Sequence, residues 1–226
     1  MNRKTKKIKR QSLSNRIVHW TTAGSIFLLI ISGILQLPIG KRYNVDKLFG
    51  EWWVHYFNTL TLHYIGATIL IFIVFYHIFV HSIKKEFDIM PKKGDVKQSY
   101  LIIKAMLTKG KEPKSDKYLA EQRLAYLFIG VSVLLLVFTG MIKMIKNVPG
   151  ASISYEVIFW STTIHNIATV LLILGIVAHL AAFLIKENRA MLPGMFTGYV
   201  DEEYVKHRHS IWHKKLQKKK QLKKSI

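Results

Sequence analysis

The chain has 226 residues, half of them hydrophobic, and a formal charge of +21 from 34 Lys and Arg against 13 Asp and Glu. Soluble domains of this size seldom combine such apolar content with so basic a composition. The combination favours a membrane protein with several spans and argues against collagen-like, disordered or nucleic-acid-binding classes. The absence of cysteine excludes disulfides, thiolate zinc sites, iron–sulfur clusters and covalently attached haem.

Four apolar stretches are long enough to cross the hydrocarbon core as helices. They cover residues 17–37, 54–82, 124–145 and 157–185. The second and fourth are longer than needed, which predicts tilt or protruding ends. None alternates with a period of two residues, so a β-barrel is a poor interpretation. The first is too long for a secretory signal and lacks a small-residue cleavage site, so we interpret it as a retained span.

The basic residues predict an orientation. The N-terminal tail, the loop between the second and third spans, and the C-terminal tail together hold 29 Lys and Arg, whereas the other two loops hold 5. Because basic residues favour the cytoplasmic side, we expect both termini in the cytoplasm and the protein in the bacterial cytoplasmic (inner) membrane. The predicted parts are a basic tail (1–16), a membrane domain (17–186) and a second basic tail (187–226). A short interfacial helix is expected near residues 98–107.

Histidines are the most informative residues. Five of the ten lie within or at the edges of the apolar stretches: His19, His63, His77, His165 and His179. An imidazole in hydrocarbon is unfavourable unless its polar atoms are satisfied, so it indicates function. A hydrogen bond between helices would explain one such residue but hardly five. No special role is expected for four others: His55 at an interface, and His207, His209 and His213 in the basic tail.

The spacing of these histidines sets their depths. His63 and His77 are 14 residues apart, as are His165 and His179. Fourteen residues leave each pair within about 40° on one helix face and about 21 Å apart. The span directions place His63 with His165 in an outer layer. They place His179 in an inner layer with either His19 or His77.

Two layers of paired imidazoles suit two haems stacked across the membrane. With both axial positions filled, such a haem transfers electrons and does no bond-making chemistry. A zinc site would need ligands clustered at one depth, and carriers of protons or cations usually place carboxylates in the span cores, where this chain has none. Beyond the histidine spacing, we expect no internal repeat.

Several short motifs belong together. At the start of the first span, Arg16 stands three residues before the pair His19-Trp20. Small-residue dipeptides lie in the first and third spans, namely Ser32-Gly33 and Thr139-Gly140. A Gly-x-Val motif opens a basic, His-containing tail at residues 198–212. With the histidine pairs, these motifs resemble the diheme cytochrome b (gamma) subunit of membrane-bound formate dehydrogenases. The wider group includes cytochrome b subunits of nickel–iron hydrogenases, and the tail favours the formate dehydrogenase branch.

The resemblance implies an all-α bundle of four transmembrane helices holding two b-type haems. His63 and His165 would bind the outer haem, and His19 would join His179 at the inner haem, with His77 as the alternative inner ligand. Menaquinone or ubiquinone would accept the electrons. The implied partners are an iron–sulfur subunit and a molybdenum or tungsten formate dehydrogenase catalytic subunit.

One segment departs from the family. Leu119 stands where the family places an asparagine that helps to bind menaquinone, which leaves Gln122 as a candidate quinone contact. Arg16 is a candidate for a haem propionate, because guanidinium binds carboxylate through two bonds; anchoring to the cytoplasmic side is an equal alternative. Four glycines in the spans either serve helix packing or let a haem approach: Gly33, Gly66, Gly140 and Gly175.

The predicted function is electron transfer from an iron–sulfur subunit through two haems to membrane quinone, with no catalytic residue for formate in this chain. The alternatives are a cytochrome b subunit of a nickel–iron hydrogenase or related quinone-linked oxidoreductase and, in another class, a non-redox membrane carrier or assembly protein. The lysine-rich segment 214–224 is expected to contact anionic lipid. It lacks the interleaved aromatics that nucleic-acid binding would need.

Overall fold

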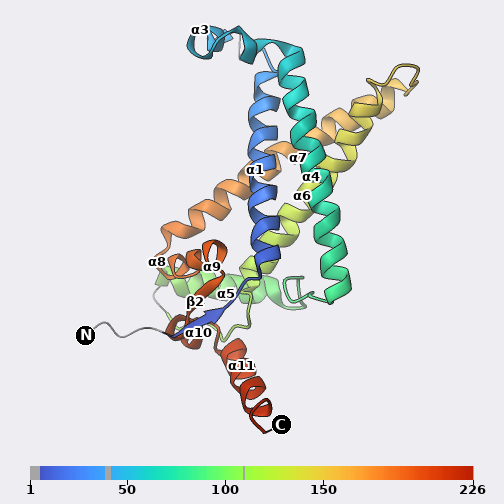
Figure 1. The fold of residues 1–226 in the computed structure, drawn as a ribbon. Coiled ribbons are helices and arrows are strands. Elements are labelled where there is room, and N and C mark those ends of the chain that lie inside the picture. Colours follow the sequence, from blue (N-terminus) through green and yellow to red (C-terminus); the bar gives the residue numbers. More distant parts are fainter. Residues whose placement is uncertain (1–5, 39–41, 109, 226) are drawn as a thin grey trace. The chain divides into compact units, whose positions relative to one another are not determined.

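The computed structural model describes residues 6–38, 42–108 and 110–225, so Lys41, counted above among the outer charges, lies outside the described residues. Within these ranges four helices are long and apolar enough to cross a membrane: α1 (Leu13–Leu35), α4 (Tyr56–Lys84), α6 (Ala120–Ile145) and α7 (Tyr155–Ala181), the last continued by a 3₁₀ turn (Ala182–Leu184) (Figure 1). The prediction of an all-α membrane chain with four candidate spans is confirmed. The haem number and the side on which the termini lie stay predictions.

The long helices expose most of their apolar side chains. Phe72 is 69% exposed and Phe138 is 73% exposed. Apolar surface on this scale indicates contact with lipid, where a helix satisfies its own backbone hydrogen bonds. The helix ends follow local signals, since the Ser12 hydroxyl accepts a hydrogen bond from the Asn15 amide at the start of α1. The backbone turns left-handed at Lys85, where α4 ends.

Shorter elements connect the long helices or follow the last of them. They are α3 (Val45–Phe49), a 3₁₀ turn (Glu51–Val54), α5 (Asp95–Thr108), α8 (Lys186–Arg189), α9 (Leu192–Phe196), α10 (Glu202–Arg208) and α11 (Ser210–Leu222). α5 covers the short helix predicted near residues 98–107. β1 (Lys7–Lys9) pairs antiparallel with β2 (Tyr199–Asp201), with Ile8 opposite Val200. The two tails are therefore hydrogen-bonded to each other.

The chain divides into two compact units. The first unit comprises residues 1–16, 86–132 and 171–226, and the second comprises residues 17–85 and 133–170. In the first unit a small apolar core lies under the two strands, formed by Ile8, Val200, Val205 and Trp212. In the second unit α1 and α4 lie alongside each other, with Gly66 packed against Leu29 (Figure 1). The predicted division into two tails and a membrane domain stays a prediction.

Candidate functional site

Each of the two predicted outer histidines is held by a hydroxyl from a neighbouring helix. In the second unit, the Ser32 hydroxyl of α1 lies 3.0 Å from Nδ1 of His63 on α4. The Thr139 hydroxyl of α6 lies 2.8 Å from Nδ1 of His165 on α7. A second polar partner on one ring nitrogen is the usual support of a metal-binding imidazole, because it fixes the ring and leaves the other nitrogen for the metal.

A glycine follows each of these hydroxyl residues. A Cβ added at Gly33 would meet Cε1 of His63 at 3.5 Å, and one at Gly140 would meet Cε1 of His165 at 3.5 Å. These are ordinary contacts, so helix packing does not itself require glycine at either position. At both positions the atoms within 4 Å of such a Cβ belong to the imidazole, so each glycine lies directly beside its histidine ring.

The other two glycines are explained by packing. A Cβ at Gly66 would lie 3.1 Å from Cγ of Leu29, and one at Gly175 would lie 3.0 Å from Cε1 of Phe128. Both distances are too short for a real Cβ without movement of the neighbour. Of the two roles considered for the four glycines, close helix packing thus accounts for this pair.

Charged and polar neighbours connect the two outer histidines. The imidazoles of His63 and His165 lie within electrostatic range of each other, and the Lys143 ammonium acts on both. The Asn147 amide, just after α6, donates a 2.7 Å hydrogen bond to the hydroxyl of Tyr64, next to His63. Lys143 counted only as an outer charge in the sequence; its electrostatic effect on both rings makes it a candidate partner for an acidic group of a ligand.

The residues present fit a haem better than a bare metal ion. Across the part of the chain that the structure describes, no three His, Cys, Asp or Glu side chains gather as a metal site. Two imidazoles alone are too few for zinc, which takes four ligands. They are sufficient for haem iron, whose equatorial positions the porphyrin fills.

The predicted inner histidines lie on three helices. His19 on α1 contacts the ring of Trp20, and His77 on α4 lies with its ring centroid 4.3 Å from that of His81. Both belong to the second unit, whereas His179 near the end of α7 belongs to the first and contacts Phe183. Which of His19 and His77 accompanies His179 stays a prediction.

Arg16 and Gln122 both have protein partners in the first unit. Nη1 of Arg16 donates to the Phe196 carbonyl at 2.5 Å. The Gln122 side-chain oxygen accepts from the Leu119 amide at 3.1 Å, and its nitrogen contacts the Met191 sulfur at 3.0 Å. Leu119 is fully buried. A propionate contact by Arg16 and a quinone contact by Gln122 stay predictions, and either would compete with these bonds.

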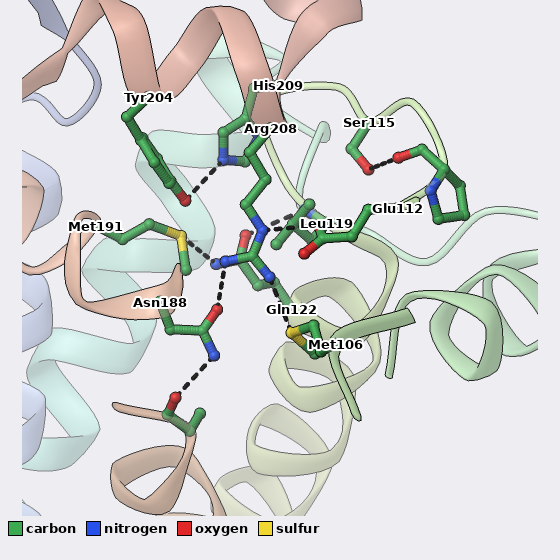
Figure 2. A network of polar contacts seen from close by, with 12 residues as sticks. Met106, Glu112, Ser115, Leu119, Gln122, Asn188, Met191, Tyr204, Arg208 and His209 are labelled. Atoms are coloured by element: carbon green, nitrogen blue, oxygen red, sulfur yellow. Dashed lines mark hydrogen bonds and ion pairs between the residues drawn. The ribbon is translucent and has the colours of Figure 1, made fainter. Parts of the chain in front are cut away.

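A buried polar network surrounds Arg208 in the first unit (Figure 2). Its guanidinium donates to the Glu112 carboxylate at 2.9 Å and to the Asn188 side-chain oxygen at 2.6 Å, and it lies 3.1 Å from the Met106 sulfur. These partners come from the loop after α5, from α8 and from α5 itself. Arg208 therefore fastens the C-terminal tail to the segment before α6.

His209, beside it, is fully buried, so the expectation that it has no special role is wrong. Its Nδ1 lies 2.6 Å from the Asp116 carbonyl and must donate to it. Nε2 then accepts from Nη1 of Arg10 at 3.2 Å and from the Tyr204 hydroxyl at 3.3 Å. The surrounding lysines hid this role in the sequence. The one signal available was Trp212, a large apolar side chain within the basic segment.

We expect the first unit to lose stability in mild acid through His209. Burial, with repulsion from the Arg10 guanidinium, lowers the pKa of His209 to about 3. The pKa of a histidine in an unfolded chain is about 6.5, so between the folded and the unfolded pKa the unfolded state binds more protons than the folded state. Stability then falls as the pH drops below about 6.5, by up to about 1.4 kcal/mol per pH unit, and is unaffected by this group above that pH.

Hydrogen exchange of the α10–α11 peptide between about pH 5 and pH 7 measures this loss. His209→Gln should flatten the pH dependence, although the variant is less stable at neutral pH. His207→Gln is the control, because His207 is exposed on α10, two residues before His209. An unchanged slope in the His209 variant would contradict the assignment.

Comparisons with known proteins identify the family of this chain. A family model described as prokaryotic cytochrome b561 matches residues 10–198, a range that includes all four long helices. The chain is 28% identical over 225 residues to the cytochrome b556 (Fdn) subunit of the nitrate-inducible formate dehydrogenase of Escherichia coli strain K12. The alignment covers 95% of this chain and 94% of that protein. The proteins of the same name from Escherichia coli O157:H7 and Shigella flexneri match equally.

Proposed function

This chain belongs to the prokaryotic cytochrome b561 family, and we propose that within it the chain is the cytochrome b subunit of a quinone-linked formate dehydrogenase. The family makes it a membrane electron-transfer protein that uses haem b. The observation that carries the site assignment is the matched support of His63 and His165, each with Nδ1 against a hydroxyl and its ring beside a glycine. The similarity to formate dehydrogenase subunits along 95% of the chain supports the choice of complex.

The histidines have distinct roles in this proposal. His63 and His165 hold an outer haem, and His19 with His179 holds an inner one, with His77 as the alternative to His19. Haem b held by two imidazoles supplies one-electron transfer with no open coordination position. Lys143, whose charge acts on both outer rings, neutralises a propionate of the outer haem in this proposal.

The proposed partners rest on the similarity to a formate dehydrogenase subunit. This chain has no cysteine for an iron–sulfur cluster. In the proposed complex an iron–sulfur subunit docks on the outer loops, and formate is oxidised in a molybdenum or tungsten catalytic subunit. Menaquinone or ubiquinone is reduced near the cytoplasmic face of the inner membrane, where protons are taken up. At that face a quinone contact by Gln122 would compete with its bonds to Leu119 and Met191.

The reduced-minus-oxidised visible spectrum of the purified chain tests this proposal. We expect b-type bands and two haems per chain. A haem to protein ratio near zero would overturn the proposal and favour a non-redox carrier or assembly protein. Genes flanking this one distinguish formate dehydrogenase from the hydrogenase alternative, since each complex needs its own catalytic subunit.

A further inference from the structure

The first and third long helices repeat one arrangement of residues. In α1 and α6, an arginine, a serine and a hydroxyl-glycine dipeptide stand at identical intervals: Arg16, Ser25 and Ser32-Gly33; Arg123, Ser132 and Thr139-Gly140. Both serines are buried and bond to a carbonyl of their own helix. The expectation of no repeat beyond the histidine spacing is therefore wrong. Exchange among apolar residues and unequal connecting segments conceal the repeat in the sequence.

The second and fourth long helices repeat as well. In α4 and α7 a buried hydroxyl residue stands four positions before the outer histidine, a buried small residue three positions after it and a buried leucine seven positions after it. In that order the residues are Thr59, Gly66 and Leu70 around His63, and Ser161, Ala168 and Leu172 around His165. The same face is thus buried in both helices. The chain contains two copies of one helix pair, α1 with α4 and α6 with α7.

Hydrogen-bond distances fix the donor at each hydroxyl. The Ser32 hydroxyl lies 2.7 Å from the Leu28 carbonyl of its own helix, and the Thr139 hydroxyl lies 2.7 Å from the Leu135 carbonyl. A carbonyl cannot donate, so the single hydroxyl proton lies in this bond. The contact with the histidine must then use a proton on Nδ1, which the hydroxyl oxygen accepts.

We infer that Ser32 and Thr139 are positioning residues, which hold His63 and His165 in the Nδ1–H form and leave Nε2 of each as the ligand atom for the outer haem. This inference rests on the proposed function and adds the groups that orient the ligands. Each copy of the helix pair supplies one imidazole and one hydroxyl. The hydroxyl accepts a hydrogen bond from Nδ1–H of the imidazole and donates one to a backbone carbonyl, and we call these two consecutive bonds the relay. The outer site is in this way built from two equivalent halves.

The relay makes each imidazole a stronger electron donor. A hydrogen bond from Nδ1–H to an acceptor raises the basicity of a ligand histidine, and losing such support commonly lowers metal affinity about 10-fold or more. A more basic ligand favours ferric over ferrous iron. Removing either hydroxyl should therefore raise the midpoint potential of the outer haem and weaken its retention, and removing both should do so further.

Redox titration of the purified full chain, followed by optical and low-temperature EPR spectra, tests the inference. The variants are Ser32→Ala and Thr139→Val, the second of which keeps the side-chain shape. Ser25→Ala and Ser132→Ala are matched controls, because each removes a buried hydroxyl two helical turns earlier on the same helix. Ser32→Thr and Thr139→Ser keep a hydroxyl and should behave nearly as the unmodified chain.

We expect the outer-haem potential and EPR signal to shift in Ser32→Ala and Thr139→Val and to stay unchanged in both controls. The inner haem reports in each sample that the chain is folded. Equal behaviour of all four variants, shifted or unshifted, would overturn the inference while leaving the proposed function intact. An unmodified chain that binds no haem would instead overturn the proposed function, and this inference with it.

Discussion

Replacing either His63 or His165 with alanine is expected to remove the same haem and leave the other in place. The two imidazoles are equivalently supported, by Ser32 and by Thr139, and lie within electrostatic range of each other. Losing one of two axial ligands leaves the iron held on one side only. Haem content by pyridine haemochromogen should fall from two to one per chain in each single variant, with no further loss in the double variant.

His55→Ala is the matched control, because this exposed histidine precedes α4 and faces none of these groups. The inner layer is tested in the same series. His179→Ala and His19→Ala should remove the other haem, and His77→Ala should keep both. Loss of a haem in His77→Ala with retention of both in His19→Ala would assign the inner ligand to His77. Retention of both haems in His63→Ala would contradict the outer pair.

Asp95→Asn is expected to destabilise the first unit by about 3 kcal/mol. Asp95 accepts two hydrogen bonds from the Arg123 guanidinium, at 2.5 and 2.7 Å, and both side chains are buried. Its carboxylate also accepts from the Lys92 amide at 2.7 Å. The guanidinium of Arg123 holds the pKa of Asp95 below its usual range. The substitution leaves this guanidinium buried without its counter-charge, which is the unfavourable part.

Hydrogen exchange of α5 in detergent measures the loss, since α5 begins at Asp95. Lys6→Ala is the comparison, because Lys6 is 70% exposed in its 3.5 Å contact with Glu202. An exposed pair of this kind contributes less than about 1 kcal/mol. Equal protection of α5 in the two variants would show that the Asp95–Arg123 pair does not hold this unit together.

The spans could be predicted because the hydrocarbon core demands about 20 apolar residues whatever the partner helices are. The depth of the histidines followed from helix rise alone. The hydroxyl partners of these histidines could not be predicted, because the sequence does not state that α1 packs against α4 or α6 against α7. Once those pairs are known, Ser32 and Thr139 are the hydroxyls at the depth of His63 and His165.

The polar interior of the first unit was missed for a different reason. Arg208 and His209 lie in a lysine-rich segment, where solvated side chains are the ordinary expectation, yet both are buried, and each bonds to a residue more than 90 positions earlier in the chain. In the sequence, Leu119 indicated only that a quinone-binding asparagine is missing. In the structure it is a core residue whose backbone amide donates a hydrogen bond to Gln122. Long-range contacts of this kind leave no local pattern.

The β1–β2 pair constrains how the protein is made. Residues 7–9 leave the ribosome before their partners at 199–201, which follow only after the last long helix has been synthesised. The β1–β2 pair can therefore form only after residue 201 has been synthesised. It also imposes a parity rule, since two strands can pair only in the same compartment. The chain must cross the bilayer an even number of times, and losing a single crossing during insertion would leave both strands without a partner.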